Sequence, residues 1–504
     1  MVRAGEDLLR GGVLEVELGA DELVGALLSL GPERRLHLLD SGGARGADAR
    51  LLVAGFDPSE VVESYGDELR VCERGRGAAL TRRGPVLSLL DARLAEMRAA
   101  RTRLQARPGG PCRWLAEGAC VVTLSYELAR QFLRLRTTRP PSTRREPDAV
   151  LAFFDALVIH DYARGRTFIN GARPAHGLAE MRETLLGAAQ SAARALPPSD
   201  AAAAAAPSVS PRHTVESPSG LPPGVSSNFT RAEYELAVER VRRHIFAGDI
   251  YQANLTQQLT CRPAPGVTPE RVFLRLRREH PASFAAFVRR GAGAVVSASP
   301  ERFLRVQGEE GVGRVVEAWP IKGTRPRGRD AAGDVRLRAE LLASEKDRAE
   351  NVMIVDLMRN DLGRVCRYGS VEVAELCALQ EHPTLFHLVS KVRGRMLEGV
   401  TAGELLRAAF PCGSITGAPK LRAMEILDAV ETARRGVSMG SIGYFTPGGA
   451  ADLSVAIRTL TFDAEGSARL NVGGGVVADS DPAAEYEETL VKARALLRAL
   501  RNDE

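Results

Sequence analysis

The spacing of apolar and polar residues is clearest in the second half of the chain, where it predicts a helix followed by a strand. Apolar residues recur at helical spacing through TRAEYELAVERVRRHIFAGD, which starts at Thr230. Thr230 and Glu233 form a capping-box pattern at the start of this segment, and Gly248 marks its end. The next residues, DIYQANLTQQLT, are strand-like. A helix is therefore expected to lead directly into a strand at about residue 249.

Similar patterns predict further elements on both sides of this segment. Helices are expected at 344–362 and 483–501, and strands at 293–299, 453–463 and 469–477. The first part of the chain combines the short apolar runs RRLHLLD and DAVLAFFDALVIHD with one amphipathic helix, LLDARLAEMRAARTRL. This mixture is typical of an α+β fold.

A compositionally biased segment divides the chain. Residues 196–228 contain seven prolines and six consecutive alanines, and almost no large apolar side chain. Such a segment cannot bury enough apolar surface to order itself. We therefore predict an N-terminal region at 1–190, a low-complexity flexible insert or linker at 191–228, and a C-terminal domain at 229–504.

Composition narrows the class of protein. With 504 residues and 44% hydrophobic content the chain can form a large packed core, and it has no signal-like or membrane-spanning apolar run. We expect a soluble, cytoplasmic protein. The seven cysteines are scattered, which disfavours both a disulfide framework and a zinc site. The net charge of +5 is small and no basic run stands out, so nucleic acid is not an expected partner.

Two predicted helices carry acidic pairs. Asp347 and Glu350 are three residues apart on one helix, and Glu485 and Glu488 are three apart on another, so each pair shares a helix face. Such a pair is usually a solvated helix face. Two pairs that converge could instead hold Mg²⁺, which prefers carboxylate oxygens.

Two glycine-containing segments could approach a ligand. Gly417 and Ala418 precede Pro419 and an apolar helix, so backbone N–H groups could cradle a carboxylate, or the segment could be an ordinary tight turn. The three glycines at 473–475 either admit a ligand to the backbone or form a turn or bulge. Arg458 lies in an apolar strand pattern, where an arginine usually needs an acidic partner or an anionic ligand.

Nine segments resemble, in sequence and order, the signatures of the chorismate-utilising enzymes. They are GDIYQANLTQ, SASPERF, PIKGTRPRG, DRAENVMIVDLMRNDLG, GSITGAPK, GSIGYFT, VAIRTL, GGGVVADSDP and EYEETLVKA. The resemblance is dense over 230–500 and looser in the first half, where LLDSG and LSYELAR carry it. Within the family, the chain is most similar to aminodeoxychorismate synthase component I and next to anthranilate synthase component I.

This resemblance implies both a fold and an activity. The implied fold is α+β of the anthranilate synthase component I type, with large antiparallel sheets surrounded by helices and the active site in the central cleft. The implied activity is Mg²⁺-dependent amination of chorismate to 4-amino-4-deoxychorismate for 4-aminobenzoate and folate synthesis. Ammonia would come from glutamine through a partner glutaminase, and a separate aminodeoxychorismate lyase would act next. Anthranilate synthesis, or a silent regulator that binds chorismate or tryptophan, are the alternatives.

Lys322 decides between these activities. In EAWPIKGTRPRG it could be a solvated charge, an anion ligand or a nucleophile. Aminodeoxychorismate synthases typically have lysine in this loop and anthranilate synthases alanine, so the resemblance implies a nucleophile that forms a covalent adduct. Its amine must be uncharged to attack, and Arg325 and Arg327 are candidate neighbours that would favour this form. Relatives that add water carry lysine where this chain has Gln252, which disfavours attack by water.

The resemblance assigns the remaining site residues by role. Glu301 corresponds to the catalytic acid, and His387 to a polar group near the ring. Substrate-binding residues are Gln252, Gly323, Thr324, Gly417, Ala418, Arg458, Gly473, Gly474, Gly475 and Lys492; metal-binding residues are Glu350 and Glu488 directly, with Asp347 and Glu485 through water.

Two regions depart from the family pattern. Ser438 stands where relatives often carry an aromatic residue at the substrate. Near Asp40, Ser41, Ser283 and Phe284 the chain resembles the tryptophan pocket of the family only in part. A tryptophan site is therefore possible there, and feedback inhibition is not expected.

Overall fold

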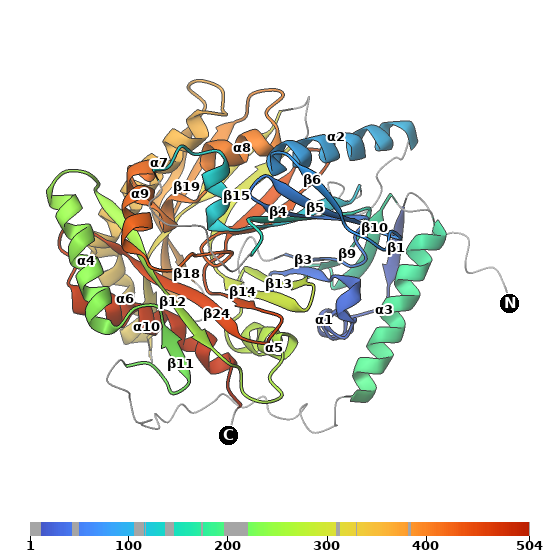
Figure 1. The fold of residues 1–504 in the computed structure, drawn as a ribbon, viewed down its shortest axis with the longest axis horizontal. Coiled ribbons are helices and arrows are strands. Elements are labelled where there is room, and N and C mark those ends of the chain that lie inside the picture. Colours follow the sequence, from blue (N-terminus) through green and yellow to red (C-terminus); the bar gives the residue numbers. More distant parts are fainter. Residues whose placement is uncertain are drawn as a thin grey trace.

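Two antiparallel sheets organise the part of the chain that the computed structural model describes (Figure 1). The described residues are 12–42, 50–104, 115, 117–136, 146–172, 175–195, 220–308, 313–328, 330–381 and 385–502. Each sheet contains twelve strands in these residues, and every pairing is antiparallel.

Sheet 1 joins strands from both ends of the chain. In spatial order it contains β1 (Val13–Val16), β10 (Arg166–Gly171), β9 (Ala156–Asp161), β3 (Leu51–Gly55), β2 (His37–Asp40), β13 (Phe284–Arg290), β14 (Gly293–Ser299), β23 (Thr459–Phe462), β24 (Ala468–Val476), β12 (Gln252–Cys261) and β11 (Val225–Ser227), with β20 (Gly417–Ala418) also paired to β12.

Sheet 2 is built in the same mixed way. Its order is β17 (Ile321–Pro326), β19 (Leu385–Arg395), β16 (Val315–Trp319), β15 (Arg302–Gln307), β22 (Ala451–Val455), β21 (Ser441–Phe445), β7 (Ala119–Leu124), β8 (Ala149–Phe154), β4 (Glu60–Tyr65), β5 (Glu68–Glu73) and β6 (Leu80–Arg83), with β18 (Glu372–Glu381) also paired to β19.

The helices lie outside this pair of sheets (Figure 1). They are α1 (Ala20–Leu28), α2 (Val86–Leu104), α3 (Ala175–Ala195), α4 (Arg231–Phe246), α5 (Pro269–Glu279), α6 (Ala331–Ala343), α7 (Glu345–Gly363), α8 (Ala402–Ala409), α9 (Lys420–Val430) and α10 (Pro482–Ala499), with short 3-10 turns at η1 (Pro32–Arg34), η3 (Tyr126–Gln131) and η5 (Gly413–Ile415). None of the described helices is long and apolar enough to cross a membrane.

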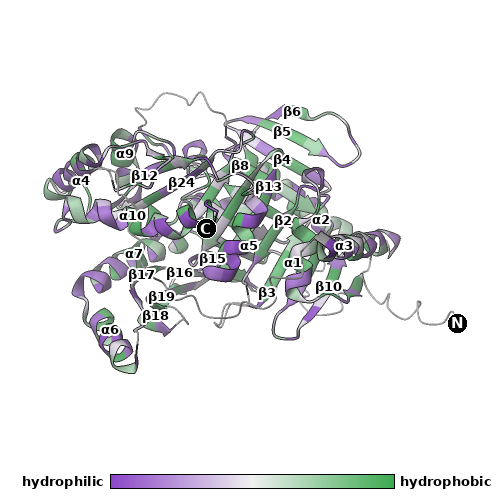
Figure 2. Ribbon diagram, turned by 90° about the horizontal axis from the view of Figure 1, so that it is seen from below, coloured by the Kyte–Doolittle hydropathy of each residue, from purple (hydrophilic) through white to green (hydrophobic). Residues whose placement is uncertain are grey.

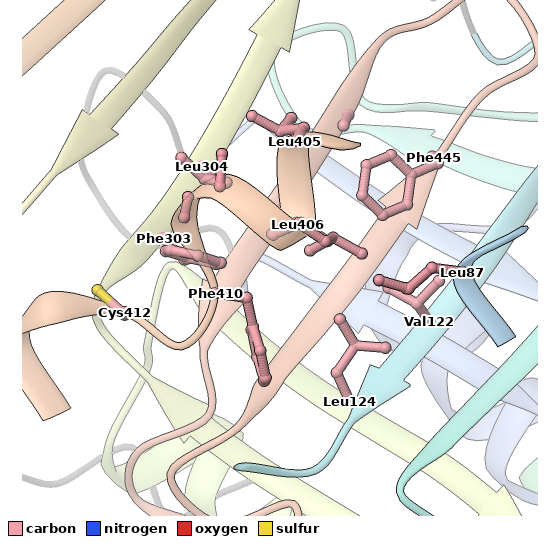
Figure 3. Packing of buried hydrophobic residues seen from close by; sticks show 14 of the residues in the cluster. Leu87, Val122, Leu124, Phe303, Leu304, Leu405, Leu406, Phe410, Cys412 and Phe445 are labelled. Carbon is pink, nitrogen blue, oxygen red and sulfur yellow. The ribbon is translucent and has the colours of Figure 1, made fainter. Parts of the chain in front are cut away.

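Buried apolar clusters hold these layers together. One cluster includes Val53 of sheet 1 and Val121 of sheet 2, so the two sheets face each other. The outer face of sheet 2 packs against α2 and α8, and the outer face of sheet 1 against α1, α3 and α5. Figure 2 shows hydrophobic residues concentrated in central strands such as β8 and β13. Figure 3 shows part of the cluster on sheet 2, with labels on Leu87, Val122, Leu124, Phe303, Leu304, Leu405, Leu406, Phe410, Cys412 and Phe445.

Several predicted elements are confirmed. The Thr230 hydroxyl accepts a hydrogen bond from the Glu233 N–H at 3.3 Å, and the Thr230 N–H donates to the Glu233 carboxylate at 2.7 Å, so the capping box starts α4. α7 and α10 correspond to the helices expected at 344–362 and 483–501. These helices were predictable because caps and apolar spacing are local features of the sequence.

The strand predicted at 453–463 is wrong, and the error is informative. It is two strands, β22 in sheet 2 and β23 in sheet 1, separated at Arg458, whose φ is +50°. The chain crosses between the same sheets at Asp155 and again between Ser299 and Arg302. Backbone hydrogen bonds from Val455 N to Glu301 O and from Ala298 N to Arg458 O join two of these crossings. Glu301 and Arg458 therefore lie together at the seam between the sheets.

The predicted regions 1–190 and 229–504 both contribute strands to each sheet. They meet where β2 pairs with β13 and where β7 pairs with β21. Of the predicted linker at 191–228, residues 191–195 end α3 and 225–227 form β11, while 196–219 lie outside the described residues. The three-part division itself stays a prediction.

Candidate active site

The three glycines of β24 form one wall of the candidate site. They pair in regular register with Asn254, Leu255 and Thr256 of β12, so the expected alternative of a turn or bulge does not apply. A Cβ at Gly475 would lie 2.2 Å from Gln252 Nε2 and 3.3 Å from Lys322 Nζ, and one at Gly474 would lie 2.6 Å from Glu485 Oε2. Glycine is required here because side chains from other elements approach the strand backbone closely.

Lys322 points toward this wall from β17. Its side chain is 14% exposed, and Nζ lies 3.4 Å from Glu350 Oε2. The interpretation as a solvated surface charge is therefore wrong. Arg325, which we expected beside it, instead pairs with Glu340 at 2.7 Å and with Asp347 at 3.4 Å. Arg327 forms an ion pair with Asp334.

Glu301 lies buried at the seam near Lys322. Burial raises its pKa to about 7, although a hydrogen bond from Ser414 and the charge of Lys322 oppose the shift. Its Oε1 atom is buried and has no hydrogen-bond partner among the described residues. A carboxyl group in this state is partly protonated at neutral pH and has an oxygen available to donate a proton.

Ser414 is a neighbour of Glu301 that the sequence analysis did not single out. It belongs to η5, directly before the predicted substrate cradle, and its hydroxyl lies 3.3 Å from Cys412 Sγ. Its place inside the segment GSITGAPK was the only available signal. Spacing along the sequence does not reveal which residue of such a loop faces the buried acid.

The Thr324 and His387 side chains are joined across neighbouring strands. They occupy paired positions on β17 and β19, and Thr324 Oγ1 lies 2.9 Å from His387 Nδ1. Gly323 has a φ of +80°, and a Cβ there would be 2.9 Å from Asp347 Cβ. Only glycine therefore lets β17 lie this close to α7.

The four predicted metal-binding acids lie on α7 and α10, and three of them have cationic partners. Glu350 is near Lys322, Asp347 pairs with Arg325, and Glu488 Oε1 lies 2.5 Å from Lys492 Nζ. Glu485 is buried and accepts a hydrogen bond from Ser480 Oγ at 2.7 Å. Among the described residues, no three His, Cys, Asp or Glu side chains gather into a group that could hold a metal ion.

The chemistry of this acidic set nevertheless fits a hard divalent cation. Glu485 Oε2 is buried without a hydrogen-bond partner among the described residues, and burial raises the Glu485 pKa. Burial also acts on Glu488, but the charges of Lys492 and other nearby lysines outweigh it and lower the Glu488 pKa. Mg²⁺ prefers carboxylate oxygens and usually keeps several of its waters, so the Glu485 oxygen could accept a hydrogen bond from one of them. The magnesium site stays a prediction.

The predicted cradle at Gly417 and Ala418 lies against the start of β12. These residues form β20 and pair with Gln252 and Ala253, and Ala418 O accepts a hydrogen bond from Tyr251 N at 2.7 Å. A Cβ at Gly417 would lie 2.2 Å from Gln252 O, so an ordinary turn residue would not fit. α9 begins at Lys420, with Pro419 as its N-cap.

Two predicted cationic groups lie at the same wall or seam. Lys492 Nζ donates to Gly473 O at 2.8 Å, and the Arg458 side chain is exposed where the sheets meet. Gln252 completes the wall, with its Oε1 buried and unpartnered among the described residues. The structure thus brings together the predicted residues from β12, β17, β24, α7 and α10.

The possible tryptophan pocket lies on sheet 1. Ala285 of β13 pairs with Asp40 of β2, so Phe284 and Ser41 occupy adjoining ends of paired strands, with Ser283 just before Phe284. The Asp40 carboxylate contacts Tyr162 Oη at 2.6 Å and Arg277 Nε at 2.7 Å. Ser438, the other departure from the family, is buried and accepts a hydrogen bond from Asn471 N. Tryptophan binding stays a prediction.

A separate cavity of about 500 Å³ lies away from these residues. It is bounded by the loop at 56–58, the end of β5 and α3. Most of its arginines are paired with acids: Arg34 with Asp57, Arg74 with Asp155 and Arg76 with Glu73. It contains none of the predicted site residues, so we assign it no function.

Comparison with known proteins identifies the family. Residues 40–498 match the family described as chorismate binding enzyme. The chain belongs to the chorismate binding enzyme family. It is 36% identical over 465 residues to aminodeoxychorismate synthase component 1 of Klebsiella aerogenes, covering 92% of this chain and 93% of that protein. It is 38% identical over 394 residues to anthranilate synthase component 1 of Streptomyces coelicolor, covering 77% and 73%.

A solved structure agrees with this assignment. Anthranilate synthase component I from Streptococcus pneumoniae superposes with a TM-score of 0.69 at 25% identity, covering 90% of this chain and 93% of that one. The expected α+β fold with large antiparallel sheets is confirmed. This member of the chorismate binding enzyme family is a chorismate-utilising enzyme of the anthranilate or aminodeoxychorismate synthase component I type.

Proposed function

We propose that the chain is an aminodeoxychorismate synthase component I, which converts chorismate and ammonia into 4-amino-4-deoxychorismate. The observation that carries this proposal is the position of Lys322, whose amine is largely buried, lies beside Gly475 and reaches Glu350. The loop PIKGTRPRG has lysine where anthranilate synthases typically have alanine. The Klebsiella aerogenes relative with the name aminodeoxychorismate synthase component 1 matches nearly the whole chain.

In the proposed reaction, the uncharged Lys322 amine bonds to C2 of the chorismate ring while the C4–O bond breaks. Glu301 donates a proton to the departing hydroxyl, which leaves as water. Its pKa of about 7 suits this role, because an acid that titrates near the working pH both holds and releases a proton. Ammonia then bonds to C4 as the C2–N bond to Lys322 breaks, and the Glu301 carboxylate accepts the proton that the new amine loses.

Chorismate is a dianion, and the site offers groups that would bind its two carboxylates. Arg458, Lys492 and the backbone of Gly473–Gly475 would hold the pyruvyl side, with Gly417 and Ala418 beside them. Thr324 and His387 would contact the ring. Glu350 and Glu488 would bind Mg²⁺ directly and Asp347 and Glu485 through water, and the ion would neutralise the ring carboxylate and polarise the ring.

The partners follow from the proposed chemistry. A glutaminase subunit would supply ammonia from glutamine, since the relatives are named as component 1 of their enzymes. A separate lyase would remove pyruvate to give 4-aminobenzoate, a folate precursor. Such an enzyme would work as a cytoplasmic protein.

Product analysis tests this proposal. The purified chain is incubated with chorismate, Mg²⁺ and ammonium, with and without an added aminodeoxychorismate lyase. We expect chorismate to be consumed in both reactions and 4-aminobenzoate to form only with the lyase. Fluorescent anthranilate without the lyase would establish the alternative activity. No consumption of chorismate would indicate the silent regulator.

A trapping experiment tests the role of Lys322. When the chain is incubated with chorismate and Mg²⁺ but no ammonia, mass spectrometry should detect a covalent adduct on the peptide that contains Lys322. The Lys322→Ala variant should lose both the adduct and at least about 1,000-fold in kcat, because a removed nucleophile cannot be replaced by its neighbours. Normal turnover by this variant without an adduct would reject the nucleophile.

A further inference from the structure

The Arg302 side chain, next to Glu301, is held by two aromatic rings and one acid. Its guanidinium carbon lies 4.9 Å from the centroid of the Phe284 ring and 4.7 Å from that of the Trp319 ring. Nε and Nη2 donate to the two carboxylate oxygens of Asp452 at 3.0 and 3.1 Å. The side chain is only 3% exposed. A buried, bidentate and stacked arginine is fixed in position much more tightly than a surface one.

This cluster connects the two sheets at their seam. Phe284 begins β13 of sheet 1, whereas Arg302, Trp319 and Asp452 belong to β15, β16 and β22 of sheet 2. The Trp319 ring also lies 4.1 Å from Lys391 Nζ of β19. These five side chains therefore form one continuous group of cation–π and ionic contacts across both sheets.

The backbone of this cluster continues directly into the candidate active site. Glu301 precedes Arg302, and Lys322 follows Trp319 by three residues. The backbone N–H of Ile321, between Trp319 and Lys322, donates a hydrogen bond to the Glu301 side chain. Arg302 and Trp319 are also paired in the ladder between β15 and β16. The proposed acid and the proposed nucleophile are thus each attached to one member of the cluster.

Strand pairing alone does not fix the segments that carry Glu301 and Lys322. The pairing of β15 with β16 shifts register between Arg302 and Arg305, and its pairing with β22 shifts between Arg302 and Leu304. β17 also shifts register between Ile321 and Thr324. Irregularities of this kind re-aim side chains and interrupt the pairing that would otherwise fix them. The segments that carry Glu301 and Lys322 therefore need side-chain contacts to fix their orientation.

We propose that Arg302, stacked on Trp319 and Phe284 and paired with Asp452, is a positioning residue that aligns Glu301 and Lys322 for the reaction. This inference rests on the proposed function. Its physical basis is that a displacement of about 1 Å between reacting groups costs roughly 100-fold in rate. In this proposal Arg302 acts through its contacts with Phe284, Trp319 and Asp452 and not on the substrate.

Arg302→Lys tests the inference, because it keeps the charge opposite Asp452 but removes the planar group that stacks on the rings. We expect kcat to fall roughly 10- to 100-fold, with the KM for chorismate changed by less than about threefold. The alkaline limb of the kcat profile, which reports Glu301, should also move. The matched control is Arg305→Lys on the same strand, which should leave kcat and the pH profile unchanged.

Two Trp319 variants provide a graded series in case the Arg302 variant does not fold. A phenyl ring still attracts a cation, although more weakly than indole, and leucine has no aromatic ring, so Trp319→Phe should reduce kcat less than Trp319→Leu. A fluorescence measurement reports on the stack directly, because the chain has two tryptophans and Trp114→Phe leaves Trp319 as the only one. In the Trp114→Phe background, Arg302→Lys should increase quenching of Trp319 fluorescence by acrylamide.

The outcomes separate this inference from the proposed function. A wild-type chain that does not consume chorismate would overturn both. Wild-type turnover together with an unchanged kcat and pH profile in Arg302→Lys, or equal activity in the two Trp319 variants, would overturn the positioning role alone. A lower melting temperature with no change in the pH profile would also overturn it, because that result describes a purely structural residue.

Discussion

At the scale of single residues, the candidate site depends on two groups held in unusual surroundings. Lys322 is removed from solvent but lies beside an acid, and Glu301 is buried with one oxygen unpartnered among the described residues. Burial costs both groups hydration, which opposes folding, although the Glu350 carboxylate offsets part of that cost for Lys322. Such costs are common at sites where the chemistry needs them.

The raised pKa of Glu301 predicts that the activity depends on pH. Its pKa rises from 4.5 to about 7 on folding, so the carboxyl is protonated below that value and charged above it. We expect kcat to decrease as pH rises through 7, because the proton donor is lost. Activity should be measured from pH 6 to 9 at saturating chorismate. A kcat that stays constant across this range would show that Glu301 is not the acid.

The same shift affects stability with a definite sign. The folded state holds the proton more tightly than the unfolded state, so burial of Glu301 destabilises the fold as pH rises from 4.5 through 7. Glu301→Gln is always neutral, and we expect it to raise the free energy of unfolding at pH 8 by roughly 1–3 kcal/mol while abolishing turnover. Urea unfolding at pH 5 and pH 8 checks this, since the gain should largely disappear at pH 5.

At the scale of elements, the helices of the site could be predicted from the sequence, but the way residues from different elements come together could not. Capping residues and apolar spacing locate α4, α7 and α10, because these signals lie within each helix. The crossings at Glu301 and Arg458 leave no comparable local pattern, so 453–463 reads as one strand. The partners of the acids also come from other elements, as Lys322 does for Glu350. The resemblance to the family indicated which residues act together in the site, whereas hydrophobic periodicity could not indicate this.

The β24 wall gives a prediction at the same scale. In Gly475→Ala the added Cβ would meet Gln252 Nε2 at 2.2 Å, and that side chain can move away, so the fold should lose only about 1–2 kcal/mol. The new methyl would also occupy space next to Lys322 Nζ. We expect kcat/KM for chorismate to fall roughly 100-fold, since small displacements of reacting groups are costly.

Gly25→Ala is a suitable control for that variant. Gly25 lies inside α1, where a Cβ would meet nothing within 4 Å, and alanine favours a helix over glycine. It should keep full activity and be slightly more stable. Equal kcat/KM for Gly475→Ala and Gly25→Ala would show that β24 does not border the reacting groups.

At the scale of the whole molecule, the candidate site exists only because two sheets are completed by distant parts of the chain. β2 supplies a neighbour for β13 in sheet 1, and β7 supplies one for β21 in sheet 2. The cluster between the sheets also combines residues from 50–161 with Tyr444 of β21. Nearly all predicted site residues nevertheless lie after residue 250, which makes 229–504 look self-sufficient in sequence.

The structure predicts that residues 229–504 do not form a folded domain by themselves. Expressed alone, 229–504 would expose the edge of β13 that β2 pairs with and the edge of β21 that β7 pairs with, and unpaired strand edges promote aggregation. We expect this fragment to be insoluble or to lack a cooperative thermal transition, and co-expression with 1–195 should restore both solubility and chorismate consumption. A soluble fragment that unfolds cooperatively and turns over chorismate by itself would show that the shared sheets are dispensable, and that the seam residues are positioned by the C-terminal strands alone.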